Sequence, residues 1–331
     1  RPCGCGRNQG PAGRGSACTM KVVYFGTPAF SASVLEHLIH KGVDVVAVIS
    51  RPDRPVGRRQ QVQPVPVKLV AEAHGIPIYQ PEKVSDPSFS TTLHSFGADL
   101  FVVVAYGEIL KQPVLDTPLK GCINLHASLL PRYRGAAPIQ RVLIDGATES
   151  GVTVMHMVKK MDAGAMIAKA KVAVPLEMTY GELEQELCKI GSELLLNVLQ
   201  TSAHGLPKGE EQNESQVTFA PKIELEDCKL DWSKSAISQH NLVRGVNPEP
   251  GAWSEVLVGD EKKRLKIYKT YPWIDLKGAS GEVSITSDKK ILVGCSNGSL
   301  ELLELQPEGK KRMRAIDYLQ GLAGKSLRFI S

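Results

Sequence analysis

The 331-residue chain has few aromatic residues and little net charge. Phe, Trp and Tyr together make up 5% of the sequence, and 40 Lys and Arg against 35 Asp and Glu leave a formal net charge of +5. A surplus this small does not by itself indicate nucleic-acid binding, so any basic site must be local. No stretch approaches the roughly 18 consecutive apolar residues that a membrane-spanning helix requires. The sequence therefore predicts a protein with no membrane association.

The cysteines are odd in number and irregularly spaced. Their spacing matches neither a zinc ribbon nor a small disulfide framework. The seven are Cys3, Cys5, Cys18, Cys122, Cys188, Cys228 and Cys295. This usage predicts a reducing compartment and a cytoplasmic protein of the bacterial type, and it implies no metal.

Residues 1–19 differ in composition from the rest of the chain. They contain Arg1, Arg7 and Arg14 with no acidic residue, and five glycines and two prolines oppose the amphipathic helix of an organellar presequence. We expect a non-native or upstream leader without ordered structure, and Met20 as the natural start. Organellar targeting is the less favoured alternative.

Past Met20, apolar runs alternate with stretches of helical spacing. A short run ends at Phe25 in a Gly-containing turn, and Phe30 to His40 has apolar residues at helical spacing. Val43 to Ile49 and Asp99 to Tyr106 are further runs without polar alternation, which suit a parallel sheet covered by helices on both faces. The sequence predicts an α/β fold whose first domain, residues 20–206, is doubly wound and Rossmann-like.

A polar, turn-rich stretch interrupts this pattern after His204. We interpret residues 207–216 as a linker and residues 217–331 as a second domain. That domain has helical patterns at Ala236 to Arg244 and Arg314 to Gly321, and five short strand-like segments between turns. These segments are Ala252 to Val258, Leu265 to Tyr271, Gly281 to Ile285, Lys290 to Gly294 and Leu300 to Leu305. Five short strands predict a small β-barrel like the oligonucleotide-binding (OB) fold.

The densest cluster of polar side chains in the chain lies between Cys122 and Gln140. Asn124 and His126 are two residues apart, so on a strand they point to the same face. The carboxyl ends of strands are where open α/β sheets bind ligands. Asp162 follows in a turn-prone loop. An amide donor for an oxyanion, an imidazole for a proton and a carboxylate to orient it fit acyl transfer to an amine.

Beyond this chemistry, the cluster and several other segments resemble the methionyl-tRNA formyltransferase family. The resemblance runs from Met20 to the C-terminus. The segments are Phe25-Gly-Thr-Pro28, Pro52-Asp-Arg54-Pro-Val-Gly57-Arg58, Val103-Val-Ala-Tyr-Gly107, Gly121-Cys-Ile-Asn-Leu-His126, Ser128-Leu-Leu-Pro-Arg-Tyr-Arg-Gly-Ala-Ala-Pro-Ile-Gln140, Asp162-Ala-Gly164, Asn247-Pro-Glu-Pro250-Gly251-Ala-Trp253 and Leu305-Gln-Pro-Glu-Gly-Lys-Lys311.

The resemblance implies transfer of a formyl group from 10-formyltetrahydrofolate, the co-substrate, to methionine on initiator tRNA. It assigns Asn124, His126 and Asp162 as the catalytic residues. It also implies a pocket for the pterin ring of the folate, whose apolar lining suits a flat heterocycle. The pocket residues it assigns are Val104, Tyr106, Ile109, Leu110, Ser128, Leu129, Leu130 and Pro131.

Two basic segments are candidate tRNA surfaces. In the first domain, Arg51, Arg54, Arg58, Arg59 and Lys68 against Asp53 give a local balance of +4, and the family uses this loop at the acceptor end of tRNA. In the second domain, alternating basic and apolar residues on a strand place the charges mostly on one side. These basic residues are Lys262, Lys263, Arg264 and Lys266, with a second cluster from Lys310 to Arg314.

Three alternatives remain open. A formyltransferase acting on glycinamide ribonucleotide, or another small substrate, would share the first domain's chemistry but would have no use for the barrel. A formyltetrahydrofolate hydrolase would share it too. A non-catalytic RNA-binding protein is disfavoured because Asn124, His126 and Asp162 are all present. We expect the protein to be a monomer.

Overall fold

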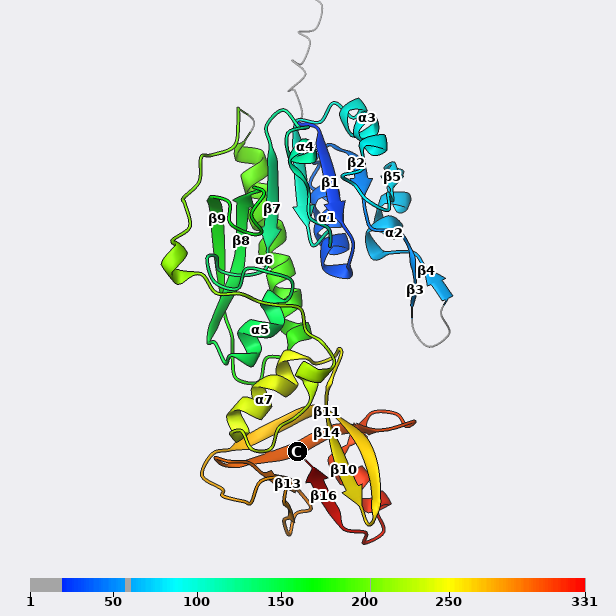
Figure 1. Ribbon diagram of the computed structural model, residues 1–331, viewed down its shortest axis with the longest axis vertical. Coiled ribbons are helices and arrows are strands. Elements are labelled where there is room, and N and C mark those ends of the chain that lie inside the picture. The colour runs from blue at the N-terminus through cyan, green and yellow to red at the C-terminus, as the bar shows by residue number, and fades with distance from the viewer. Residues whose placement is uncertain (1–19, 57–60, 203, 331) are drawn as a thin grey trace, which may run out of the picture.

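The computed structural model describes residues 20–56, 61–202 and 204–330. Within that range the chain forms two halves that follow one another along the long axis of the molecule, each built on its own sheet (Figure 1). The expectation for residues 1–19 falls outside the described residues. In the described part of the chain, no helix is long and apolar enough to cross a bilayer.

The first half contains a mixed sheet with the order β5-β2-β1-β6-β7-β8-β9. The strands from β5 to β7 pair in parallel, whereas the β7–β8 and β8–β9 pairs are antiparallel. Their bounds are β1 (Val22–Gly26), β2 (Val45–Ile49), β5 (Ile78–Tyr79), β6 (Leu100–Val104), β7 (Cys122–His126), β8 (Glu149–His156) and β9 (Met166–Ala173). The strand order reverses between β1 and β6, which confirms the doubly wound, Rossmann-like prediction.

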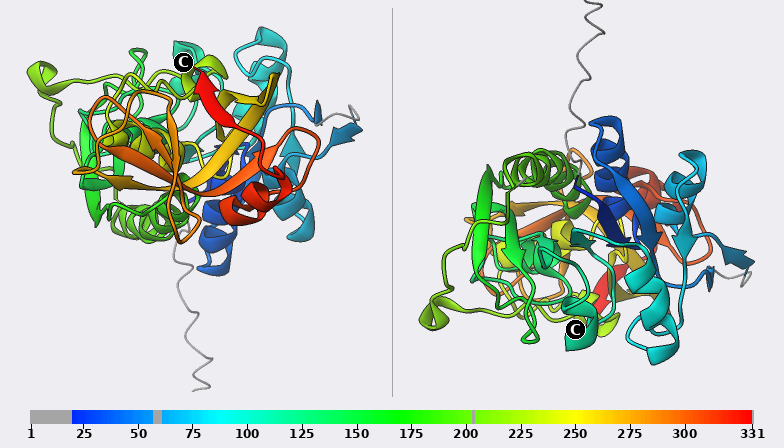
Figure 2. Two further views of the ribbon diagram at one scale, coloured as in Figure 1. Left: turned by 90° about the horizontal axis from the view of Figure 1, so that it is seen from below. Right: turned by 90° about the horizontal axis from the view of Figure 1, so that it is seen from above.

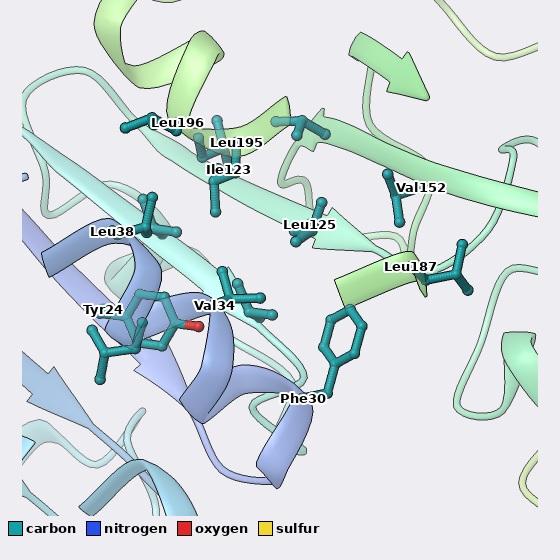
Figure 3. Packing of buried hydrophobic residues seen from close by; sticks show 14 of the residues in the cluster. Tyr24, Phe30, Val34, Leu38, Ile123, Leu125, Val152, Leu187, Leu195 and Leu196 are labelled. Carbon is teal, nitrogen blue, oxygen red and sulfur yellow. The ribbon is translucent and has the colours of Figure 1, made fainter. Parts of the chain in front are cut away.

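Helices cover both faces of this sheet, which explains why its strands are apolar without alternation. One face is covered by α1 (Ala29–His40), α2 (Pro66–Ala73) and α6 (Tyr180–Thr201), and the other by α3 (Pro87–Ser95) and α4 (Gln112–Leu115). Successive residues enter different layers, because Tyr24 packs in the layer of α1 and Phe25 packs with Phe101 on the other face. Figure 3 shows the first layer, which includes Ile123 and Leu125 of β7.

The second half is an antiparallel barrel that is nearly closed. The strands follow the order β12-β13-β14-β11-β10-β16, and the Phe329 amide donates to the Gly281 carbonyl oxygen at 3.1 Å. Their bounds are β10 (Ala252–Val258), β11 (Glu261–Trp273), β12 (Val283–Ile285), β13 (Ile291–Gly294), β14 (Ser299–Pro307), β15 (Met313–Arg314), which pairs with β14, and β16 (Leu327–Ile330). The prediction of an OB-like barrel is confirmed. The five strands predicted from the sequence do not include β16, which pairs with β10 near the C-terminal end of the described residues.

The two halves meet at α5 (Pro138–Ile144) and α7 (Ala236–Gly245), which lie side by side (Figure 1). The guanidinium of Arg244 on α7 donates to the carbonyl oxygens of Pro175 and Met178 at 3.2 and 3.3 Å. Both acceptors lie between β9 and α6. The helix α8 (Ala315–Gly321) lies in the barrel half. The contact between halves is therefore polar as well as apolar, and it joins backbone of one half to a side chain of the other.

The segment from 207 to 216 packs against the first half instead of crossing free solvent. Glu210 and Met166 exchange both backbone hydrogen bonds, at 2.7 and 2.9 Å, and the Gln212 side chain is buried. Two single-turn helices follow, η1 (Glu214–Gln216) and η2 (Glu226–Cys228). The position of the domain boundary within this segment stays a prediction.

A small hairpin projects from the edge of the first half (Figure 2). β3 (Arg54–Val56) pairs antiparallel with β4 (Gln61–Gln63), and Pro55 faces Val62. This hairpin belongs to the basic segment that the sequence predicts as a tRNA surface. Arg58 and Arg59, which follow β3 in the sequence, lie outside the described residues.

Candidate active site

The carboxyl end of β7 places two of the predicted catalytic residues on one face of the sheet. Ile123 and Leu125 enter the layer of α1 and α6, so Asn124 and His126 point to the opposite face, along with Cys122. Asn124 is half-buried and lies opposite Met155 of β8 in the strand register. Burial raises the pKa of the Cys122 thiol to about 12, so this thiol is an inert core group.

His126 has one ring nitrogen fixed by the backbone and one nitrogen beside a carboxylate. The side chain is 8% exposed. Its Nε2 lies 2.9 Å from the Tyr133 carbonyl oxygen, and because a carbonyl only accepts, Nε2 must carry the proton and donate. Its Nδ1 lies 3.7 Å from Asp162 Oδ2, which is beyond hydrogen-bond distance. In the neutral ring Nδ1 is therefore free to take up a proton next to a negative charge.

Asp162 is held in a left-handed backbone conformation on the loop between β8 and β9. Its φ is +50°, a region that a non-glycine residue occupies only with support from its surroundings. Its Oδ2 accepts a hydrogen bond from the Gly135 amide at 2.8 Å. The loop after β7 thus contacts both His126, through Tyr133, and Asp162, through Gly135.

The Ser128–Pro131 part of this loop is tied down by hydroxyl groups. Ser128 Oγ donates to the Arg132 carbonyl oxygen and Thr153 Oγ1 donates to the Ser128 carbonyl oxygen, both at 2.7 Å. Leu130 packs with Met155 and Met166, and Pro131 is buried beside it after a cis peptide bond. Leu129 is partly exposed and is the member of this group most accessible to a ligand.

The other predicted folate-pocket residues differ in how accessible they are. Val104 is completely buried in the layer of α1, and Tyr106 and Leu110 are almost completely buried on the opposite face. Ile109 is 66% exposed. The Tyr106 hydroxyl has no hydrogen-bond partner among the described residues, and burial raises its pKa. Glu108 and Arg51 lie near enough to act on this pKa in opposite directions, Glu108 raising it and Arg51 lowering it.

In the basic segment of the first half, the three described basic side chains of the predicted set each contact an acidic neighbour. Arg51 Nη1 lies 2.6 Å from Glu108 Oε2, and Arg54 Nη2 lies 3.2 Å from Glu82 Oε2. Lys68 Nζ bonds Asp53 Oδ2 at 2.7 Å, and this contact holds the start of the hairpin against α2. The geometry thus makes Arg51 a structural anchor of the loop and leaves Arg54 exposed.

The basic side chains of β11 alternate as the sequence predicts. Leu265 and Ile267 point into the barrel, and Lys262, Arg264 and Lys266 point outward. Lys262 Nζ lies 2.8 Å from Glu255 Oε1, Lys266 Nζ donates to the Pro250 carbonyl oxygen at 2.8 Å, and the Arg264 guanidinium stacks 3.7 Å above the Trp253 ring. Lys263, on the other side of the strand end, bonds Glu261 at 2.7 Å. Local partners therefore offset part of this positive charge.

Two other features could accept small ligands but lie apart from His126. A cavity of about 420 Å³ opens between the two halves, lined by residues of α7, β11 and the start of α6. Glu36, His40 and His74 are exposed, and their ligand atoms lie within 4.8 Å of one another. Neither set contains a predicted catalytic residue.

Comparison with known proteins decides the family. Residues 20–199 match the formyl transferase family, and residues 222–323 match the formyl transferase C-terminal domain. The chain belongs to the formyl transferase family. Relatives named methionyl-tRNA formyltransferase match it over nearly their full length. The protein of Protochlamydia amoebophila (strain UWE25) is 54% identical over 94% of this chain and 98% of the relative, and that of Staphylococcus epidermidis (strain ATCC 12228 / FDA PCI 1200) is 40% identical over 93% and 99%. The predicted family and formyl-transferring activity are confirmed.

Solved structures of formyl transferases share the fold at low sequence identity. HypX from Aquifex aeolicus, solved in complex with tetrahydrofolic acid, is 17% identical with a TM-score of 0.62, over 92% of this chain and 48% of HypX. An N-formyltransferase from Helicobacter canadensis, in complex with folinic acid and dTDP-3-aminofucose, is 17% identical with a TM-score of 0.63, over 87% of this chain and 99% of that protein. These likenesses support the two-part fold of the formyl transferase family.

Sequence reasoning did not find Arg134 and Gln212. Both side chains are buried: Arg134 precedes Gly135 in the loop after β7, and Gln212 donates to the backbone of the Asp162 loop. Arg134 lies inside the polar cluster between Cys122 and Gln140, where nothing in the sequence distinguishes a buried arginine from an exposed one. Gln212 lies in a stretch of polar residues that has no pattern to set it apart.

Proposed function

We propose that the chain transfers a formyl group from N10 of 10-formyltetrahydrofolate to the α-amino group of methionine esterified to initiator tRNA. The observation that carries the proposal is the pair His126 and Asp162 at the carboxyl end of β7, with Asn124 on the same strand face. The names of the full-length relatives support tRNA as the substrate.

In this reaction the neutral amine attacks the formyl carbon. The new nitrogen–carbon bond forms, the carbonyl oxygen becomes an oxyanion, and the bond from carbon to N10 then breaks. The amine loses one proton and N10 gains one. The Asn124 amide is placed to donate to the oxyanion, and His126, with Nδ1 unbonded, holds the proton in transit. The Asp162 carboxylate lies 3.7 Å from Nδ1, where it would orient the ring.

The folate pocket that we propose lies along the loops after β6 and β7. Leu129 is the partly exposed apolar side chain of the β7 loop that would contact a flat heterocycle, and Tyr106 and Leu110, which are almost completely buried, would support the pocket from the core. The loop after β7 would take its shape from Ser128, Leu130 and Pro131. Ile109 would cover the pocket. Val104 would act through the packing of β6.

For tRNA, we propose that the two basic surfaces act at different places. The hairpin segment, with Arg51, Arg54, Arg58 and Arg59, lies in the catalytic half, residues 20–206, and would meet the acceptor end. The outward side chains of β11, with Lys263 at its end, would bind phosphates from the second half, residues 217–331. The reaction would need both halves in one polypeptide.

The test is a formylation assay with purified full-length protein. Incubation with 10-formyltetrahydrofolate and methionyl initiator tRNA should give formylmethionyl-tRNA, and methionyl elongator tRNA should give much less. Release of formate without tRNA would indicate a hydrolase, and formylation of a small amine in preference to the tRNA would indicate a small-substrate enzyme. Folded protein that yields no formylmethionine would overturn the proposal.

A further inference from the structure

The loop that contacts both His126 and Asp162 contains a buried arginine between the two contacting residues, Tyr133 and Gly135. Arg134 is 1% exposed, and its Nε and Nη2 donate to Gln212 Oε1 at 2.9 and 2.7 Å. Its Nη2 also bonds Glu214 Oε1 at 3.0 Å. Lys160 and Arg134 together lower the pKa of Glu214, so this carboxylate is charged. A buried cation is costly unless it is paired, and here the pairing depends on the segment that leads to the second half.

The Gln212 side chain connects Arg134 to the loop that carries Asp162. Its Nε2 donates to the carbonyl oxygens of Asp162 and Gly164 at 2.8 and 2.9 Å. The Gln212 amide therefore uses both hydrogens on this loop and both acceptor directions on Arg134, which fixes its orientation. The two bonds support the left-handed conformation of Asp162, which a non-glycine residue adopts only when its surroundings hold it there.

The next residues of the same segment hold the other side of the site. The Tyr133 amide donates to Thr218 Oγ1 at 2.9 Å, the Arg134 amide donates to the Thr218 carbonyl oxygen at 2.9 Å, and the Ala220 amide donates to the Arg134 carbonyl oxygen at 2.7 Å. Tyr133 in turn accepts from His126 Nε2 at 2.9 Å. Residues 212–220 are thus bonded to the loops that fix both His126 and Asp162.

We infer that Arg134 and Gln212 are positioning residues that set the distance and orientation between Asp162 and His126. The inference rests on the proposed function. Neither side chain needs to touch substrate: Gln212 acts through the backbone of Asp162, and Arg134 acts through Gln212 and through its own backbone next to Gly135. Gln212, Thr218 and Ala220 therefore belong to the support of the catalytic site, and the stretch of chain that carries them does more than connect the two halves.

The discriminating variant is Gln212→Glu. A carboxylate still accepts from Arg134 but has no hydrogen to donate to the two carbonyl oxygens, so Arg134 stays paired while the Asp162 loop is released. We expect kcat for formylation to fall about tenfold to a hundredfold, with KM for folate and for tRNA within about twofold. Gln216→Glu is the matched control, because Gln216 is exposed in the same segment and its side chain makes no hydrogen bond among the described residues. It should retain the wild-type kcat.

A second measurement separates positioning from general support of the fold. In an Asp162→Ala background, Gln212→Glu should lower kcat by less than about twofold, because its effect acts through Asp162. If Gln212→Glu does not fold, Arg134→Lys keeps the charge and loses the forked contact, and it should show a fall in kcat and the same dependence on Asp162.

Two results would overturn the inference. One is a normal kcat in Gln212→Glu; the other is an equal fall with and without Asp162. Failure of the proposed function itself would be seen separately, as a folded wild-type protein that makes no formylmethionine.

Discussion

His126 in the first half and His240 in the second are both buried, but their ring nitrogens are used differently. His240 on α7 is 3% exposed. Its Nε2 donates to the Leu176 carbonyl oxygen and its Nδ1 accepts from Thr270 Oγ1, each at 3.0 Å. His126 has one such bond, and its second nitrogen faces a carboxylate at 3.7 Å.

The difference separates a structural histidine from one that can take part in chemistry. His240 is satisfied on both sides, and burial lowers its pKa, so the neutral ring joins Leu176 of the first half to Thr270 of the barrel. His126 keeps one ring nitrogen without a hydrogen bond among the described residues, 3.7 Å from the Asp162 carboxylate. A histidine that carries a proton in catalysis needs a ring nitrogen without a hydrogen-bond partner, whereas a histidine that joins two domains can have both ring nitrogens bonded.

The largest effect should come from the catalytic trio. Alanine at Asn124, His126 or Asp162 should each lower turnover at least about a hundredfold, because each removes a donor, a proton carrier or its charge partner. Steady-state formylation measures turnover, and filter binding should show tRNA affinity little changed. His240→Ala should change kcat less than about threefold, since it touches no reacting group. Near-normal turnover in Asn124→Ala would make the oxyanion assignment wrong.

Gly135→Ala should disturb the geometry of the catalytic site without removing any functional group. Gly135 has φ of +127°, and an added Cβ would lie 2.7 Å from the Ala220 carbonyl oxygen. We expect kcat to fall about tenfold, because the amide that bonds Asp162 must move. Gly42→Ala is the control: Gly42 also has positive φ, at +81°, but an added Cβ would meet nothing within 4 Å. If both variants keep full turnover, Asp162 does not depend on this loop.

The sequence predicts the chemistry of the site better than its support. Asn124 and His126 are found because spacing of two on a strand fixes a face, and Asp162 because the family segments include it. Gln212 has no local signal, since its role depends on Arg134, which is 78 residues away along the chain. Val104 is assigned to the pocket by the family resemblance, which does not report burial, and its side chain is buried in the core.

Charge patterns show the same limit on the tRNA surfaces. Alternation on β11 correctly gives the outward side of Lys262, Arg264 and Lys266, because a period of two is local. Their partners are not local: Glu255 of β10 neutralises Lys262, and Trp253 stacks under Arg264. Counting charges along a segment therefore overstates how much positive charge is available to a phosphate.

A smaller effect should appear in stability against pH. The pKa of His240 is lowered in the folded state, from an unfolded value of about 6.5. Below that pH the unfolded chain binds the proton first, so the contribution of His240 is complete above about pH 6.5 and is lost as pH falls toward the folded pKa. Between pH 7.5 and 5.5, urea unfolding should show a larger loss of stability in the wild type than in His240→Gln, which keeps a donor for Leu176 and does not titrate in this range. Equal losses in both proteins would assign the pH dependence elsewhere.

The smallest effect should separate the two tRNA surfaces by their salt dependence. A side chain that binds one phosphate contributes about 0.9 to the slope of log K against log salt concentration. Arg58→Ala should therefore lower the slope of tRNA binding by about one or a little less. Lys262→Ala should lower it by clearly less than Arg58→Ala, because Lys262 in the free protein is paired with Glu255 at 2.8 Å and must give up that partner to bind phosphate. Glu255→Gln is the control for this argument, since it frees Lys262 and should raise affinity at low salt. Equal slope changes in Arg58→Ala and Lys262→Ala would mean that the local ion pair does not compete with phosphate, and an unchanged slope in both would place the phosphate contacts on other side chains.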